Sequence, residues 1–153
     1  MVRIAIALGS NLGDRRAHLV SAIGQLNAFV TSLRASSFID TDPVGVDEPQ
    51  PAYLNAVAVG ETALAPRDLL EQLLAIERAH GRTRPSVRSS RTLDLDLILY
   101  GDAVLHEDGL DVPHPRFRER RFVLDPLVEV ARDWIDPVTG KTMGALLERL
   151  LTS

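Results

Sequence analysis

The sequence predicts an α+β fold in which helices pack on an antiparallel β-sheet. Short stretches with the two-residue alternation of strands are separated by longer stretches in which apolar residues recur at helical spacing. Their order is strand, helix, strand, strand, helix, strand, with further helices after them. This order is that of the ferredoxin-like βαββαβ sandwich, which covers one sheet face with helices and leaves the other for loops and ligand. The length of 153 residues fits a single domain, residues 1–153.

The first half of the sequence predicts strands separated by one helix. Residues 3–8 alternate as a strand does and end at Gly9. Asn11 is expected to cap a helix that runs to about Phe29. The next strands are expected at residues 36–41 and 53–62, on either side of a proline-rich loop.

The second half predicts a helix, a strand and two terminal helices. Pro66 suits the first turn of a helix that Gly81 closes, and the polar stretch 82–91 is expected to be an exposed loop. A strand with alternating leucines follows, and a turn leads into a further short strand. The last helices are expected at about residues 123–131 and 143–151, after an irregular stretch.

The composition excludes several kinds of function. The sequence has no cysteine, which rules out disulfides, thiolate metal sites and thiol catalysis. A net charge of −4 argues against general binding of nucleic acids. The apolar stretch at the N-terminus is too short to cross a membrane and has no signal-peptide cleavage pattern, so we expect a cytoplasmic protein without a membrane partner.

Two aspartates lie on the same side of the strand with alternating leucines. The four leucines from Leu93 to Leu99 are expected to face the helices, while Asp94 and Asp96 face the open side, about 6.6–6.8 Å apart along the chain. Two carboxylates at this spacing can hold hard cations, and a two-metal site fits between them. For an isolated pair, a solvated strand face or an edge strand protected by charge is the better explanation, so the motif alone is weak evidence for a metal site.

Arginines gather on both sides of the aspartate pair. Arginine matches planar, multiply charged anions, so these clusters next to paired carboxylates suggest a polyphosphate held together with metal ions. The sequence contains neither a Walker A phosphate loop nor a dinucleotide-binding fingerprint, so side chains and metal would have to hold a nucleotide. The clusters are Arg82, Arg84, Arg88 and Arg91 before the pair, and Arg116, Arg118, Arg120 and Arg121 after it.

A second, flat ligand is suggested by Tyr53 and Asn55, which alternate onto one face of a predicted strand. An aromatic ring and a nearby amide can stack on a heterocycle and hydrogen-bond to its edge, and Phe122 could close the other side. Packing of the ring and capping of a turn by the amide would explain the same residues. His114, between two prolines, fits a phosphate donor or a surface turn.

Five segments together resemble the family of 6-hydroxymethyl-7,8-dihydropterin pyrophosphokinases, enzymes of folate biosynthesis. The resemblance extends from residue 4 to about residue 150 and is most specific in R-T-L-D-L-D followed by V-P-H-P. It implies transfer of pyrophosphate from Mg-ATP to the hydroxymethyl group of the pterin, giving AMP and the pterin diphosphate. The segments are ALGSNLGDR, DPVGVDEPQPAYLNAV, IERAHGRTR, RTLDLDLILYGD and VPHPRFRERRFVLDPLVEVA.

The resemblance also implies roles for individual residues. Asp94 and Asp96 correspond to the ligands of two Mg²⁺ ions, and Asn11 to a supporting position. The residues that match ATP-binding positions are Glu77, Arg82, Arg91, His114 and Arg120, of which Arg82 and Arg91 are the catalytic candidates. The residues that match pterin-binding positions are Val44, Gly45, Tyr53, Asn55 and Phe122. We expect a monomer that binds these two small-molecule substrates and no nucleic acid.

The sequence departs from the family pattern before Arg91. Many members have a tryptophan within R-W-G-P-R, whereas this chain has V-R-S-S-R, one residue shorter, and Leu74 stands where a glutamine is common. Two alternatives remain. Another metal-dependent nucleotide hydrolase or nucleotidyltransferase with a D-x-D motif would leave the aromatic residues without a role. A ferredoxin-like RNA-binding or regulatory module conflicts with the negative net charge and the 5% aromatic content.

Overall fold

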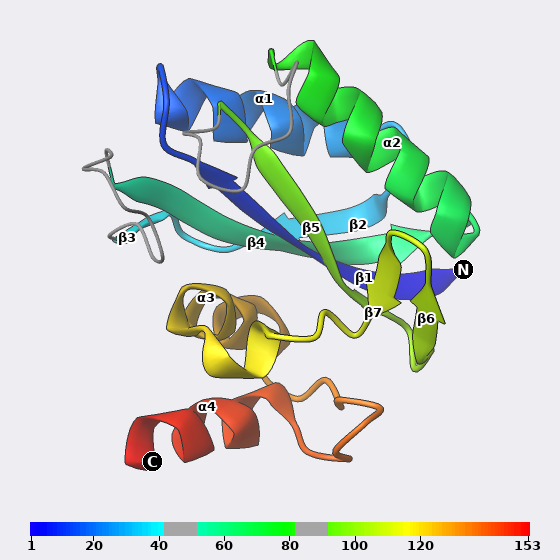
Figure 1. Cartoon of the computed structure of the whole chain (residues 1–153), viewed down its shortest axis with the longest axis vertical. Coiled ribbons are helices and arrows are strands. Elements are labelled where there is room, and N and C mark those ends of the chain that lie inside the picture. Colours follow the sequence, from blue (N-terminus) through cyan, green and yellow to red (C-terminus); the bar gives the residue numbers. More distant parts are fainter. Residues whose placement is uncertain (42–51, 82–91) are drawn as a thin grey trace.

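The structure is a computed structural model and describes residues 1–41, 52–81 and 92–153 (Figure 1). Its strands are β1 (Val2–Ser10), β2 (Thr31–Ala35), β3 (Ile39–Thr41), β4 (Tyr53–Thr62), β5 (Asp94–Tyr100), β6 (Leu105–Glu107) and β7 (Leu110–Val112). Its helices are α1 (Arg15–Leu26), α2 (Pro66–Ala79), the 3₁₀ helix η1 (Phe117–Glu119), α3 (Arg121–Ala131) and α4 (Met143–Thr152).

The main sheet confirms the predicted α+β class. Its strands lie in the order β2-β4-β1-β5, and β3 pairs with the same edge of β4 as β2 does, nearer the start of β4. All of these pairs are antiparallel, and β1 pairs with both β4 and β5. With β2 and β3 counted as one interrupted strand, this is the order expected of a ferredoxin-like βαββαβ unit. The strand β1 therefore lies between β4 and β5.

The helices α1 and α2 cover one face of the sheet (Figure 1). Leu19 and Leu26 of α1 and Leu73 of α2 are buried against that face. The predicted start of α1 is wrong: the cap is Asp14, whose side chain accepts a hydrogen bond from the backbone N–H of Ala17 at 3.0 Å. The helix also ends earlier than predicted, at Leu26, and is followed by β2, a largely exposed strand that the sequence analysis did not identify.

The opposite face of the sheet is partly covered as well. The helices α3 and α4 lie beneath it in Figure 1, and α3 packs directly on β4. The face predicted to be left for loops and ligand is therefore only partly open, on the side of the aspartates. No helix in the described ranges is long and apolar enough to cross a membrane. The buried residues of this second layer include Val57, Val59, Phe117, Leu124, Leu127 and Met143.

A β-bulge divides the leucines of β5 between the two layers. The register of β1 and β5 shifts between Ala5 and Ile6, so that Ile6 pairs with Leu97 while Ala5 pairs with Leu99. Leu97 consequently packs in the cluster between the sheet and the helices α1 and α2, but Leu99 packs in the cluster between the sheet and the helices α3 and α4. The prediction that Leu99 faces α1 and α2 is wrong, because a bulge reverses the side to which later residues point.

Candidate active site

Three paired strands bring an amide and two carboxylates onto one face of the sheet. Gly9 of β1 pairs with Asn55 of β4 on one side and with Asp94 of β5 on the other. Residues directly opposite one another on neighbouring strands share a face of the sheet. Neighbouring strands lie about 4.7–4.9 Å apart, so roughly twice that distance separates the backbone of Asn55 from that of Asp94. The pterin-side and metal-side candidates therefore lie on one continuous surface.

From Ala5 to Gly9, the strand between them contributes only small residues to this face. Ala5, Ala7 and Gly9 alternate along β1, and Ala7 lies in the row next to Gly9, opposite Asp96. A Cβ atom added at Gly9 would lie 3.2 Å from Asn55 Oδ1 and 3.4 Å from Tyr53 Cδ1. The tyrosine ring and the amide thus come close to the glycine, and a larger residue would displace them. Sequence reasoning missed Gly9, although the small–x–small–x–Gly alternation was a visible signal.

The orientation of the Asn55 amide is fixed by β3. Asn55 is 6% exposed, and its Nδ2 donates a hydrogen bond to Thr41 Oγ1, a residue that the sequence analysis did not single out. Because the amide nitrogen is engaged with Thr41, Oδ1 is the atom directed to Gly9. Tyr53 is half-buried and pairs with Thr41 across the strands. The amide is held ready to bond to the edge of a ligand, with the tyrosine ring beside it.

The carboxylates of β5 fit the requirements of Mg²⁺. Asp94 and Asp96 are half-buried and alternate with Leu93 and Leu95, which are 0% and 6% exposed. The described residues contain no group of three or more histidine, cysteine or carboxylate side chains that could hold a metal ion. Mg²⁺ in nucleotide enzymes is commonly bound by one or two carboxylates, completed by phosphate oxygens and water. The residues present suit a metal that arrives with a polyphosphate.

Glu77 supports the backbone between the two aspartates. It lies on α2, is 2% exposed, and its Oε2 accepts a hydrogen bond from the backbone N–H of Leu95 at 2.7 Å. Because the side chain of Leu95 points into the core under α1 and α2, Glu77 reaches β5 from the face opposite the aspartates. This contact holds the strand that carries Asp94 and Asp96. The predicted role of Glu77 in ATP binding stays a prediction.

His114 is held as a neutral hydrogen-bond donor. Its backbone N–H donates to Ile98 O at 2.9 Å, and its Nδ1 accepts from the backbone N–H of Arg116 at 3.2 Å. An accepting Nδ1 leaves the proton on Nε2. Burial lowers the pKa of His114, and the charges of Arg120 and Arg116 lower it further, against the opposing effect of Asp94. The structure therefore brings His114 into the electrostatic environment of both Asp94 and Arg120.

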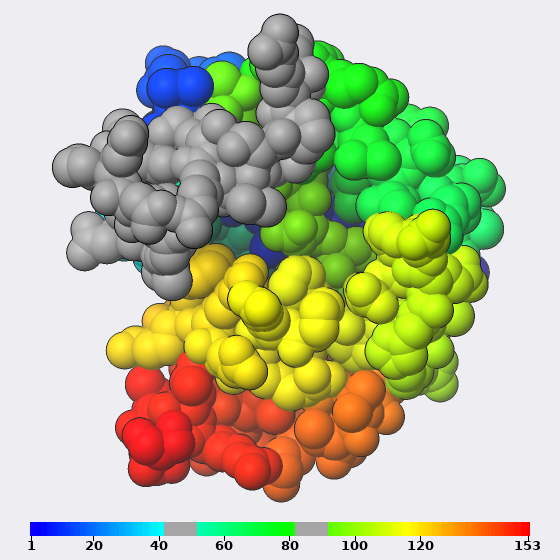
Figure 2. Space-filling view, viewed as in Figure 1, coloured from blue at the N-terminus to red at the C-terminus, as the bar shows by residue number. Residues whose placement is uncertain are grey.

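Arg120 and Phe122 lie at the start of α3. The Arg120 guanidinium is 5.5 Å from the centroid of the Phe122 ring, and the Arg120 carbonyl accepts from the N–H of Leu124, in the first turn of the helix. Phe122 packs against the same cluster as Ala7, on the face that carries Asn55. The start of a helix favours bound anions, so cation and helix terminus both favour a phosphate here. Figure 2 shows the yellow segment around residue 115 beside the green atoms of β5.

Four predicted site residues lie outside the described residues. They are Val44 and Gly45, expected at the pterin, and Arg82 and Arg91, expected at the phosphates. Their assignments stay predictions. The described candidates, in contrast, come from β4, β5 and the segment from His114 to Phe122, apart from Glu77 on α2 and the buried Asn11, which follows β1.

Comparison with known proteins shows the family. The model of the family described as 7,8-dihydro-6-hydroxymethylpterin-pyrophosphokinase (HPPK) matches residues 5–132. A 2-amino-4-hydroxy-6-hydroxymethyldihydropteridine pyrophosphokinase of Synechocystis sp. is 43% identical over 95% of this chain and 74% of its own length. The enzyme of that name from Haemophilus influenzae is 40% identical over 90% of this chain and 86% of its own length.

Longer proteins contain a similar unit. The folic acid synthesis protein fol1 of Pneumocystis carinii is 36% identical over 97% of this chain, which spans only 20% of that protein. A crystal structure of Plasmodium falciparum HPPK-DHPS has the same fold, with a TM-score of 0.77 over 99% of this chain and 45% of the other, at 13% identity. The chain therefore belongs to the 7,8-dihydro-6-hydroxymethylpterin-pyrophosphokinase family, enzymes that transfer pyrophosphate to hydroxymethyldihydropterin in folate biosynthesis.

Proposed function

We propose that this chain transfers pyrophosphate from Mg-ATP to 6-hydroxymethyl-7,8-dihydropterin. The observation that carries the proposal is the row Asn55–Gly9–Asp94, which has an amide at one end and a metal-binding carboxylate at the other. A pterin that is hydrogen-bonded to the Asn55 amide can place its hydroxymethyl group over the small residues of β1, next to the phosphates of ATP. The pterin-side residues are Val44, Gly45, Tyr53, Asn55 and Phe122; the ATP-side residues are Glu77, Arg82, Arg91, His114 and Arg120.

In the proposed reaction the pterin hydroxyl oxygen bonds to the β-phosphorus of ATP. The bond from that phosphorus to the oxygen shared with the α-phosphate breaks, AMP leaves, and the hydroxyl proton is released. Two bound Mg²⁺ ions would neutralise phosphate charge and lower the pKa of the hydroxyl. Asp94 and Asp96 would hold these ions, and His114 Nε2–H and Arg120 would donate to phosphate oxygens. Such transfer asks the protein chiefly for alignment and charge neutralisation, which these residues supply.

A direct test is to incubate the protein with Mg-ATP and 6-hydroxymethyl-7,8-dihydropterin and to separate the nucleotides. The proposal expects AMP and the pterin diphosphate in equal amounts, and no AMP when the pterin is left out. Formation of ADP or inorganic phosphate without pterin would instead favour the nucleotide hydrolase alternative. AMP joined to another molecule would favour a nucleotidyltransferase.

We also propose that the chain acts as one domain and as a monomer in the cytoplasm, where ATP is available. Support for a monomer comes from the two hydrophobic clusters, which are closed by helices of the same chain on both faces of the sheet. Light scattering coupled to size exclusion, at the protein concentration of the activity assay, measures the mass directly. A mass of twice 16.8 kDa would contradict the monomer.

A further inference from the structure

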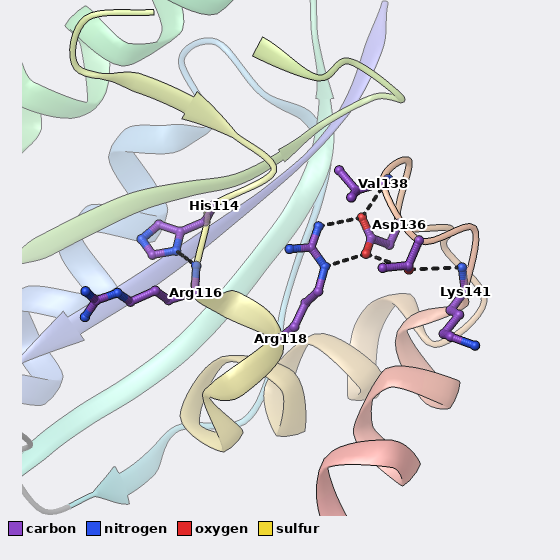
Figure 3. A network of polar contacts seen from close by, with 7 residues as sticks. His114, Arg116, Arg118, Asp136, Val138 and Lys141 are labelled. Atoms are coloured by element: carbon purple, nitrogen blue, oxygen red, sulfur yellow. Dashed lines mark hydrogen bonds and ion pairs between the residues drawn. The ribbon is translucent and has the colours of Figure 1, made fainter. Parts of the chain in front are cut away.

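An ion pair fixes the middle of the segment that carries His114 and Arg120. Arg118 donates from Nε to Asp136 Oδ2 at 2.6 Å and from Nη2 to Asp136 Oδ1 at 2.9 Å (Figure 3). Asp136 is fully buried, and the arginine side chain is 25% exposed. Two parallel bonds between a guanidinium and a carboxylate fix orientation as well as distance. The segment is therefore held at a defined angle, not only at a defined separation.

Asp136 is itself held rigidly by the turn between α3 and α4. Its carboxylate also accepts from Thr139 Oγ1 at 2.7 Å and from the backbone N–H of Val138 at 3.0 Å, while its own N–H donates to Lys141 O at 2.8 Å. Burial acts to raise the pKa of Asp136, but the bonds from Arg118, Thr139 and Val138 outweigh it and keep the pKa below its usual value. The buried carboxylate is thus a charged, oriented acceptor.

The segment around Arg118 depends on such contacts because it has little regular structure. Between β7 and α3 it contains only the short helix η1, and Phe117, which is fully buried, fixes it to the core. The Arg118 guanidinium lies 4.6 Å from the Phe117 ring centroid. In Figure 3, His114 and Arg116 extend to one side of the segment and Arg118 extends to the other, toward Asp136. Rotation of the segment would therefore move all of these side chains together.

We propose that Arg118 and Asp136 are positioning residues that aim His114 and Arg120 at the ATP phosphates. The claim rests on the proposed function, in which those two side chains contact ATP. Asp136 lies outside residues 5–132, the part of the chain that the family model matches. The region after α3 thereby contributes to nucleotide binding without touching the nucleotide. Of the pterin-side residues, Asn55 and Tyr53 lie on β4, and only Phe122, in the first turn of α3, adjoins the segment that this pair positions.

The test uses Asp136→Asn, Arg118→Met and Arg118→Lys, assayed well below their unfolding temperatures. We expect Asp136→Asn and Arg118→Met to raise the KM for ATP on the order of tenfold to a hundredfold, because small displacements of binding groups have effects of this size. The affinity for the pterin, measured by calorimetry, should change less than the KM for ATP does, because Asn55 and Tyr53 lie on β4 and Phe122 lies in α3. Arg118→Lys keeps the charge but loses the paired donors, so it should recover part of the loss.

A control variant separates positioning from loss of stability. Leu26→Ala removes a fully buried side chain of α1, in the cluster on the other face of the sheet, and should lower the unfolding temperature without changing the KM for ATP. If Asp136→Asn lowers the unfolding temperature but keeps the KM for ATP within about twofold of the wild-type value, as Leu26→Ala does, the proposal is wrong.

A nuclear magnetic resonance measurement decides the claim even if ATP is not the substrate. In the wild-type protein, proton–nitrogen correlations of the His114 ring should show a proton on Nε2 and none on Nδ1. Loss of the Arg118–Asp136 ion pair in Asp136→Asn should weaken the hydrogen bond from the Arg116 N–H to His114 Nδ1. The His114 ring should then be a mixture of its two neutral tautomers. Absence of AMP in the wild type would refute the proposed function alone. An unchanged His114 spectrum in Asp136→Asn would refute the positioning role.

Discussion

Replacing Gly9 with alanine adds one methyl group at the centre of the candidate site. The new Cβ would lie 3.2 Å from Asn55 Oδ1, which is tighter than nine in ten real contacts of this kind, and 3.4 Å from Tyr53 Cδ1. Asn55 has to withdraw by a few tenths of an ångström, although its Nδ2 is bonded to Thr41. Since φ of Gly9 is not positive, alanine suits the backbone, and the effect falls on the site itself.

The expected cost is about one neutral hydrogen bond between Asn55 and the pterin. A bond of this kind contributes about 0.5–1.5 kcal/mol, so the dissociation constant for the pterin should rise about twofold to thirteenfold. Binding of ATP should stay unchanged, because the three atoms nearest to the added Cβ belong to Asn55 and Tyr53. The free energy of unfolding should change by less than about 1 kcal/mol.

Isothermal titration of the pterin into Gly9→Ala measures this change, and Gly24→Ala is the matched control. Gly24 is exposed on α1, and a Cβ there meets nothing within 4 Å. This control should bind the pterin as the wild type does and should be stabilised by about 0.8–1 kcal/mol through helix propensity. If a folded Gly9→Ala protein binds the pterin with wild-type affinity, the proposed hydrogen bond between Asn55 and the pterin is refuted.

Three further predictions concern the metal, the ring and pH. Asp96→Asn should reduce AMP formation on the order of a hundredfold or more at saturating Mg²⁺, with nearly unchanged unfolding in urea; retained turnover would contradict the metal role. Tyr53→Ala should weaken pterin binding by about 0.5–1.5 kcal/mol while Tyr53→Phe binds normally, and equal affinities in calorimetry would argue against stacking. The pKa values of His80, lowered by burial and by His18, and of His114 are below 6.5 in the folded state. The unfolded chain therefore binds more protons on these groups below pH 6.5, so the free energy of unfolding should decrease as the pH is lowered from 6.5. Urea titrations across this range should show a smaller decrease for His80→Gln than for the wild type. The same dependence of the free energy of unfolding on pH in both proteins would contradict the prediction.

The features of the fold and site that follow from local residue periodicity were predictable from the sequence. Alternation placed Asp94 and Asp96 on one side of a strand, and Tyr53 and Asn55 on one side of another, because each pattern is local. The order of the elements gave the sheet class in the same way. What local patterns could not give is the row that joins Asn55 to Asp94, since it depends on which strands become neighbours.

Other features escaped prediction for definable physical reasons. The bulge that redirects Leu99 arises from the register of two strands far apart in the sequence. The strand β2 is largely exposed and has no apolar alternation, so tertiary pairing with β4 decides its structure. Asp136 resembles an ordinary turn aspartate in the sequence. Its role depends on Arg118, 18 residues earlier, and on complete burial, neither of which has a local signature.

The direct pairing of β1 with both β4 and β5 has a consequence for how such enzymes vary. The separation between the Asn55 and Asp94 backbones is set by hydrogen bonds across β4, β1 and β5. Substitutions that preserve the pairing of these three strands therefore keep the anchors of the two proposed substrates at a constant separation.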